Sequence, residues 1–174
     1  MPQRDQLFEW RSIWDNVTLG LRVRRERDGT AYDHVRTLLA RYGLASFAKK
    51  KPAQLSGGMR QRCALIRTLA TDPSTLLLDE PFSALDYQTR LAVSADIWHI
   101  IRQEGKTALL VTHDIAEAVS MSDRVVVLSR RPAVVKAVFD MGALKSLPPM
   151  ERRDTPQFHT FFNAIWKELD VHGG

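Results

Sequence analysis

The stretch Leu55-Ser-Gly-Gly-Met-Arg-Gln-Arg62 opens the strongest helical pattern in the chain, which predicts a helix over residues 56–72. Serine is a good N-cap, and paired glycines let the backbone come close to a ligand. A helix start presents free N–H groups and a partial positive charge, so it suits an anion such as phosphate. Arg60 and Arg62 add positive charge nearby. Ser-Gly-Gly alone favours an ordinary capped helix after a loop, whereas the whole eight-residue string is far more specific.

A second string, Leu76-Leu-Leu-Asp-Glu-Pro81, places two acids where an apolar run ends. The run 75–79 predicts a central strand that is covered on both faces. Charges at the carboxyl end of such a strand lie in the crevice where open α/β sheets bind ligands. One carboxylate of Asp79 and Glu80 can reach Mg²⁺ through water, and the other can orient a nucleophilic water. The alternative is a pair of acids that make caps or surface contacts.

Two polar groups follow further along the chain. Residues 107–112 predict a second buried strand, which ends at His113. If the two strands are neighbours, His113 points into the same crevice as Glu80, where it can donate to a γ-phosphate or hold the attacking water. A lone histidine at a strand end is usually structural, and the shared crevice is what favours the functional reading. Ser83-Ala-Leu-Asp86 reads as a turn with an N-cap for a helix that begins at residue 87.

The order of elements predicts an α/β chain. Helices come first and strands then alternate with helices, which implies a mainly parallel sheet with helices on its faces. Residues 1–14 read as irregular and residues 49–55 as a loop. The predicted helices span 15–24, 31–43, 56–72, 87–104, 114–121 and 156–170, and the predicted strands span 75–79, 107–112, 124–129 and 133–139.

The composition suits one globular domain, because the 174 residues are 44% apolar and 26% charged. The net charge of +5 is scattered in runs without interleaved aromatic residues. Solvated faces are therefore favoured over nucleic-acid binding, with weak attraction to an acidic leaflet or a membrane partner as the alternative. The single cysteine, Cys63, excludes an internal disulfide framework and is expected to be a small buried residue. No apolar run reaches the ~18–20 residues of a membrane span and no secretory signal is visible, so a cytoplasmic location is expected.

Taken together, these residues resemble the ATP-binding subunit of ABC transporters over nearly the whole chain. The resemblance implies an α/β, P-loop NTPase-type, three-layer ABC ATPase domain that is incomplete at its N-terminus and has a helical subdomain. Leu55 to Arg62 resembles the signature motif, which engages the γ-phosphate of ATP held by a partner subunit. The implied roles are phosphate binding in trans by Ser56, Gly57 and Gly58, support of Mg²⁺ by Asp79, water activation by Glu80, a D-loop at the dimer interface with Ser83 and Asp86, and a switch histidine at His113.

The segment Gln3-Arg-Asp-Gln-Leu-Phe-Glu-Trp10 resembles the Q-loop, with Gln3 as the glutamine that senses Mg²⁺ and the attacking water. Residues 8–17 would then line the groove that receives the coupling helix of the membrane subunit, although the family often has proline where Glu9 stands. Asp86-Tyr-Gln-Thr-Arg90 and the tail 158–169 resemble importers for nitrate, sulfonate or taurine. By the same resemblance, the chain divides into a Q-loop region at 1–14, a helical subdomain at 15–72, a core α/β subdomain at 73–140 and a helical tail at 141–174.

The implied function is ATP hydrolysis coupled to solute import, with ATP and Mg²⁺ as cofactors, at the cytoplasmic face of the membrane. The implied partners are a permease subunit, a second ATP-binding subunit in a homodimer or heterodimer and, indirectly, a periplasmic or surface solute-binding protein. No nucleic acid is expected as a partner.

The string G-x-x-x-x-G-K-[ST], which holds the β- and γ-phosphates in P-loop NTPases, is absent from the sequence. Gly105-Lys106 is the only Gly-Lys pair, and Ile100 stands where the first glycine is required. Two explanations stay open: a misassigned start or truncated gene, or a real short form that donates its signature motif to a complete partner. In either case we expect the chain alone to bind ATP poorly and to be inactive.

Two rival functions stay open at this point. One is a non-catalytic interaction module, which the presence of Glu80 and His113 argues against because a structural module has no need of them. The other is a soluble ABC ATPase that acts on DNA or ribosomes. Such proteins usually carry long insertions, and none lies between Gln3 and Leu55.

Overall fold

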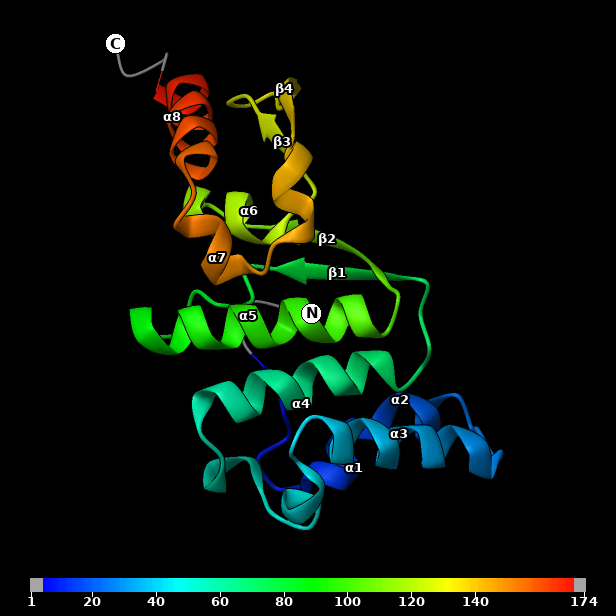
Figure 1. Ribbon diagram of the computed structural model, residues 1–174. Coiled ribbons are helices and arrows are strands. Elements are labelled where there is room, and N and C mark those ends of the chain that lie inside the picture. Colours follow the sequence, from blue (N-terminus) through cyan, green and yellow to red (C-terminus); the bar gives the residue numbers. More distant parts are fainter. Residues whose placement is uncertain (1–4, 171–174) are drawn as a thin grey trace. The chain divides into compact units, whose positions relative to one another are not determined.

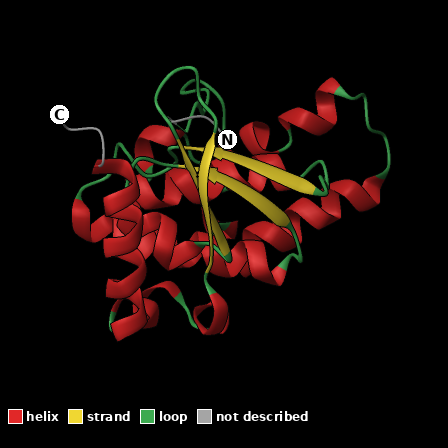
Figure 2. Cartoon of the chain, turned by 90° about the horizontal axis from the view of Figure 1, so that it is seen from above, coloured by secondary structure: helices red, strands yellow, loops and turns green. Residues whose placement is uncertain are grey.

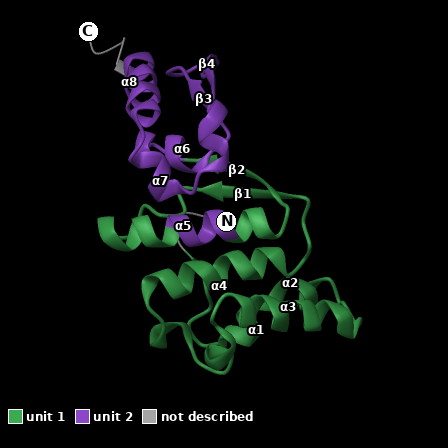
Figure 3. Ribbon diagram, viewed as in Figure 1, with its two compact units in different colours: residues 1–93, 100–111 green, residues 94–99, 112–174 purple. Residues whose placement is uncertain are grey.

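The computed structural model describes residues 5–170 and combines helices with strands (Figures 1 and 2). The contacts divide the chain into two compact units (Figure 3). Unit 1 comprises residues 1–93 and 100–111, and unit 2 comprises residues 94–99 and 112–174. The α/β class is confirmed, whereas the predicted division into four functional parts stays a prediction. No helix within the described range combines the length and the apolar character that crossing a membrane requires.

Unit 1 begins with two short helices where the sequence predicted one helix over 15–24. They are α1 (Ile13–Val17) and α2 (Leu19–Val23), and the break falls at Thr18. The Thr18 side chain is buried, and its hydroxyl donates to the Trp14 carbonyl at 2.7 Å. Such a bond to the carbonyl four residues earlier competes with the helix ladder and bends the chain. The uninterrupted helix was therefore a wrong prediction.

The next two predicted helices are confirmed as α3 (Gly29–Arg41) and α4 (Gly57–Leu69), with boundaries shifted by one to three residues. The side chains of Asp28 and Ser56 cap their first turns. The loop predicted before α4 contains two short 3₁₀ turns, Ala45–Phe47 and Pro52–Gln54. The helix α4 contacts α1, α2 and α3 (Figure 1). The buried side chains of these helices include Ile13, Val17, Leu21, Val35, Leu38, Leu39, Cys63, Leu65, Ile66 and Leu69.

The strands β1 (Thr75–Asp79) and β2 (Thr107–Val111) of unit 1 form a parallel pair, so the parallel direction is as predicted and the two strands, which the sequence left open as neighbours, are adjacent. Their register places Asp79 opposite Val111. The prediction that both strands are covered on both faces is wrong, because Leu77 is 61% exposed and Leu109 is 58% exposed. Side chains alternate between the two faces of a strand, and in β1 only the face with Leu76 and Leu78 is buried.

The helix α5 (Tyr87–Gln103) confirms the helix predicted over 87–104. Residues 94–99 at its centre belong to unit 2, and the rest of the helix belongs to unit 1. The Asp86 carboxylate accepts the Thr89 N–H at 3.0 Å, so Asp86 is the predicted N-cap.

Unit 2 contains the antiparallel strands β3 (Arg124–Leu128) and β4 (Val135–Asp140). Their pairing corrects the expectation of a mainly parallel sheet. A parallel pair needs a crossover of roughly a dozen residues or more, and residues 129–134 are too short a connection for one. The helix α6 (Ile115–Met121) confirms the helix predicted over 114–121, and the Asp114 carboxylate caps it by accepting the Glu117 N–H at 3.1 Å.

The remaining elements of unit 2 are a 3₁₀ turn at Gly142–Ser146, α7 (Pro149–Arg153) and α8 (Pro156–Asp170). The sequence predicted α8 and missed α7. The helix α8 contacts α6, α7 and both strands of this unit. The core of the unit consists of Ile115, Val119, Val125, Val127, Met141, Leu144, Phe158 and Ile165.

A fully buried arginine, Arg152 of α7, joins the loops of unit 2. Its guanidinium donates to the carbonyls of Leu147 at 2.8 Å, Ser122 at 2.7 Å and Lys145 at 3.1 Å. The guanidinium carbon also lies 5.7 Å from the centre of the Trp98 ring. Buried cations persist where hydrogen bonds satisfy them, so Arg152 is a structural residue of this unit.

Candidate functional site

The start of α4 is the place where the sequence predicted an anion site, and the site itself stays a prediction. The Ser56 hydroxyl accepts the Met59 N–H at 3.3 Å, which makes Ser56 the cap of a 13-residue helix. Ser56 and Gly57 are exposed, while Gly58 is buried. The exposed first turn of a helix combines unpaired N–H groups with a partial positive charge, so this end of α4 can accept a phosphate.

The two glycines of this turn also have a packing role that the sequence did not reveal. A Cβ atom on Gly58 would lie 2.7 Å from Cγ2 of Val93 on α5. A Cβ atom on Gly57 would lie 3.2 Å from Cδ2 of Leu85. Gly58 therefore allows α4 to approach α5 closely, whatever it does for a ligand.

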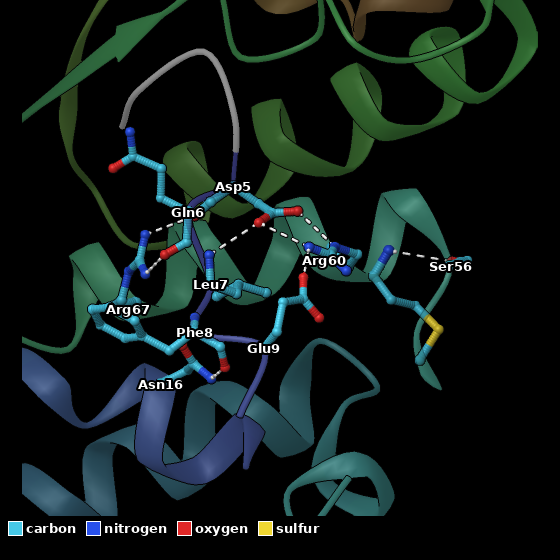
Figure 4. A network of polar contacts seen from close by, with 10 residues as sticks. Asp5, Gln6, Leu7, Phe8, Glu9, Asn16, Ser56, Arg60 and Arg67 are labelled. Atoms are coloured by element: carbon cyan, nitrogen blue, oxygen red, sulfur yellow. Dashed lines mark hydrogen bonds and ion pairs between the residues drawn. The ribbon is translucent and has the colours of Figure 1, made fainter. Parts of the chain in front are cut away.

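Arg60 does not add free positive charge to the helix start, which corrects the prediction. Its Nε donates to Asp5 Oδ2 at 2.6 Å and its Nη2 to Asp5 Oδ1 at 3.2 Å (Figure 4). The same Nη2 donates to Glu9 Oε1 at 2.5 Å. Arg62 points elsewhere and donates to the Tyr42 carbonyl at 3.3 Å. Two carboxylates balance the Arg60 charge, because each lies within direct ion-pair distance of it.

The pKa values of this cluster follow from the same contacts. The hydrogen bond to Asp5 is the largest influence on the pKa of Arg60, and with the bond to Glu9 it raises that pKa against the effect of burial. Burial by itself raises the pKa of Asp5. Hydrogen bonds from Arg60 and the Leu7 N–H, with the charges of Arg60 and Arg67, outweigh burial and lower the pKa of Asp5 below its ordinary value of 3.8.

Arg67 holds the backbone of the same segment. Its Nη1 donates to the Gln6 carbonyl and its Nη2 to the Asp5 carbonyl, both at 2.7 Å (Figure 4). Downstream, the Asn16 carboxamide accepts the Phe8 N–H at 2.7 Å and donates to the Phe8 carbonyl at 3.1 Å. Sequence reasoning missed these contacts. The available signal was the seven-residue spacing of Arg60 and Arg67, which places them on one face of α4.

Asp79 and Glu80 lie at the carboxyl end of β1, as predicted. The Glu80 N–H donates to the Val111 carbonyl at 2.8 Å, which extends the parallel pairing by one residue. Glu80 has a φ of 42°, in the left-handed region that residues other than glycine seldom occupy. A backbone of this kind costs about 1–3 kcal/mol and persists where the surroundings impose it. A glutamate at a position that suits glycine points to a use for its carboxylate.

The turn after Glu80 holds this backbone in place. The Ser83 N–H and hydroxyl both donate to the Glu80 carbonyl, at 3.3 and 3.0 Å. Ser83 therefore supports Glu80 directly. Its predicted place at a dimer interface, together with that of Asp86, stays a prediction.

Two further predicted residues, His113 and Gln3, are not tested at this site. His113 is exposed and belongs to unit 2, whereas Glu80 belongs to unit 1, so their shared crevice stays a prediction. Gln3 lies outside the described residues.

The carboxylates at the end of β1 are the candidate support for Mg²⁺. Within residues 5–170, no group of three or more His, Cys, Asp or Glu side chains is arranged to hold a metal ion. Mg²⁺ needs no such cage, because it commonly binds one or two carboxylates and completes its shell with water and phosphate oxygens. Asp79 is exposed beside a half-buried Glu80, and this arrangement fits a metal of that kind.

Comparison with known proteins gives consistent matches. A family model described as ABC transporter matches residues 1–83. An uncharacterized ABC transporter ATP-binding protein, YtlC of Bacillus subtilis, is 46% identical over 98% of this chain and 66% of its own length. The aliphatic sulfonates import ATP-binding protein SsuB 1 of Rhodococcus jostii is 47% identical over 74% of this chain and 50% of its own length. The taurine import ATP-binding protein TauB of Rhizobium johnstonii is 44% identical over 82% of this chain and 55% of its own length. The chain thus spans between half and two thirds of these relatives.

Proposed function

Since the chain belongs to the ABC transporter ATP-binding family, we propose that it contributes the water-activating half of an ATPase site to a solute importer. The observation that carries this proposal is the end of β1. There a glutamate occupies left-handed backbone, is held by the Ser83 turn and stands next to an exposed aspartate.

Three positions of unit 1, which are Glu80, the start of α4 and Asp79, have defined parts in this function. Glu80 accepts a proton from the attacking water, which is the role of a general base. The exposed start of α4 at Ser56 and Gly57 donates N–H groups to the γ-phosphate of ATP that a second ATP-binding subunit holds. Asp79 would hold Mg²⁺ together with water and phosphate oxygens, and the bound ion would neutralise phosphate charge.

The remaining assignments rest on family resemblance. Gln3 senses the metal and the water, and His113 holds the γ-phosphate or the water. Ser83 and Asp86 lie at the interface between the two ATP-binding subunits. A string of the form G-x-x-x-x-G-K-[ST] is absent from these 174 residues, so the complete site takes its phosphate cradle from outside them.

The transported solute in this proposal is an organic anion of the sulfonate or taurine type, with nitrate as a further candidate. The proposal is supported by relatives whose names describe import of aliphatic sulfonates and of taurine. The partners are a membrane permease, on whose cytoplasmic side the chain works as a peripheral subunit, and, indirectly, a solute-binding protein.

A chimera provides the test of hydrolysis. This chain replaces the 171 aligned residues of the Bacillus subtilis relative, which then supplies the rest of its own sequence. We expect Mg²⁺-dependent ATP hydrolysis by the chimera and a loss of roughly 10²- to 10⁴-fold with Glu80→Gln, the usual contribution of a general base. Glu151→Gln, at an exposed glutamate of α7, is the matched control and should leave the rate unchanged.

The outcomes separate catalysis from a purely structural role. Full activity in the Glu80→Gln chimera would refute the assignment of Glu80 as the base. An inactive parent chimera that still folds would favour the non-catalytic interaction module. The 174-residue chain by itself should hydrolyse no more ATP than its own Glu80→Gln variant, and robust turnover by that chain would contradict the division of the site between chains.

A further inference from the structure

Four charged residues join the segment 5–9 to α4, and together they are called the α4 clamp: Asp5, Glu9, Arg60 and Arg67. Arg60 lies one turn after the Ser56 cap, and Arg67 lies two turns further along the same helix face. The clamp thus spans about 10 Å of α4, given a rise of about 1.5 Å per residue.

The contacts of the clamp are stronger than those of a surface ion pair. The Arg60 and Asp5 side chains are 24% and 17% exposed, and two parallel N–H···O bonds join them. Bidentate, charge-assisted bonds of this kind have a fixed geometry and are stronger than neutral ones. The Asp5 carboxylate also accepts the Leu7 N–H at 3.0 Å, which joins the Asp5 side chain to the backbone of segment 5–9.

The Arg67 side chain adds a second attachment, which involves only the backbone of segment 5–9. It donates to two consecutive carbonyls, those of Asp5 and Gln6. Gln6 has a φ of 48°, so the backbone between these carbonyls lies in the left-handed region. A strained backbone persists only where other contacts impose it, and Arg67 supplies two such contacts. Segment 5–9 is therefore joined to α4 near both ends of the helix, at Arg60 and at Arg67.

We propose that Arg60 and Arg67 are positioning residues, which make segment 5–9 move with α4 when a phosphate binds at the start of that helix. Segment 5–9 begins two residues after Gln3 in the sequence. A displacement of α4 at Ser56 is therefore passed to the residues after Gln3 without any contact between the clamp and the nucleotide. This inference rests on the proposed function, because it takes phosphate as the ligand of α4.

Hydrogen exchange of the 174-residue chain tests the clamp without any need for activity. The Leu7 and Phe8 amides donate to Asp5 and Asn16, so both are protected while the segment is held. Hydrogen bonds to charged groups contribute about 1.5–3 kcal/mol, so Arg67→Gln should speed exchange of these amides by roughly ten- to a hundredfold. Arg36→Gln is the control, because Arg36 pairs with Asp33 on the exposed surface of α3.

Kinetics of the chimera test the coupling. A small misplacement remote from the chemistry can lower a rate by about 10²-fold. We therefore expect Arg60→Gln and Arg67→Gln to lower kcat roughly ten- to a hundredfold, with the KM for ATP changed less than about twofold. Arg60→Lys should retain part of the activity, since lysine keeps the charge but cannot form the bidentate pair.

Arg67 is the decisive position, because it lies too far along α4 to reach a phosphate at Ser56. A loss of kcat with Arg60→Gln alone, with normal exchange of Leu7 and Phe8, would show direct phosphate contact and overturn the proposal. Unchanged exchange in Arg67→Gln overturns it as well, even if the parent chimera does not hydrolyse ATP. If the parent chimera does not hydrolyse ATP, that result counts against the proposed function, and the hydrogen-exchange result alone tests whether the α4 clamp holds segment 5–9. An unreactive Cys63 thiol confirms that each variant is folded, since this side chain is fully buried.

Discussion

Replacement of Gly58 by alanine tests whether glycine is needed at this position for the packing of α4. The new Cβ would lie 2.7 Å from Cγ2 of Val93, well inside the 3.4–4 Å of ordinary van der Waals contact. Val93 cannot easily move away, because it is 4% exposed and its branched side chain has a restricted χ1. Either the valine or the backbone of α4 must therefore shift.

Two opposing terms determine the size of the effect. Overpacking a well-filled interior costs about 1–3 kcal/mol. Alanine in a helix is favoured over glycine by up to about 1 kcal/mol. The net expectation for Gly58→Ala is a destabilisation of about 1–2 kcal/mol, which corresponds to a five- to thirtyfold larger open population.

The thiol of Cys63 provides the assay, because it lies on α4 itself and is fully buried. Burial is the largest influence on the pKa of Cys63 and raises it to about 12, so the thiol is protonated and shielded in the folded chain. Labelling by a thiol reagent at pH 8 therefore reports opening of α4. We expect Gly58→Ala to be labelled about five to thirty times faster than the parent chain.

Two further variants determine whether the reasoning is correct. Val93→Ala removes the methyl group that the new Cβ meets. Val93→Ala should therefore destabilise the Gly58→Ala chain less than it destabilises the parent chain, by about 1 kcal/mol or more. Gly29→Ala is the control, because nothing lies within 4 Å of a Cβ there, and it should be neutral or slightly stabilising. Unchanged labelling in Gly58→Ala, or additive effects of Gly58→Ala and Val93→Ala, would refute the steric account.

Three more predictions concern single residues. Asp5→Asn should weaken the dependence of the free energy of unfolding on acidic pH, measured by denaturation between pH 2 and 7. The pKa of Asp5 is lowered in the folded chain, so the stabilisation by its carboxylate is present above about pH 4 and is lost as pH falls through the lower folded pKa. Burial, and after it the hydrogen bond to Glu104, raises the pKa of Tyr42 to about 12. The stabilisation by the protonated Tyr42 is therefore complete below pH 10 and is lost as pH rises through about 12, and the ionisation near pH 12 in an ultraviolet titration should disappear in Tyr42→Phe. Arg152→Leu leaves three half-buried carbonyls without their donor and should destabilise unit 2 by about 2–4 kcal/mol in urea unfolding. Arg153→Leu, at a half-buried neighbour, should cost less.

Local contacts explain where sequence reasoning succeeded. The helix caps at Ser56 and Asp86 were predicted, because each cap depends on a side chain and an N–H three residues later. The parallel direction of β1 and β2 followed from the helix between them, which supplies a long crossover, whereas their direct pairing was left open. The same kind of reasoning missed the break at Thr18, where one side-chain bond outweighs the helical pattern.

The sequence alone determined the family motifs, most of the helices and the placement of Asp79 and Glu80 at a strand end, since these depend on residue order and short-range spacing. Only the tertiary structure decided how the side chains around the signature helix are used. Arg60 looked like a cation available to an anion, but Asp5 and Glu9, more than fifty residues earlier in the chain, pair with it. The glycines looked like ligand-facing residues, but the close contact with Val93 of α5 also leaves no room for a side chain at position 58. Both outcomes depend on which distant segments pack against α4, and a pattern read along one stretch of chain does not contain that information.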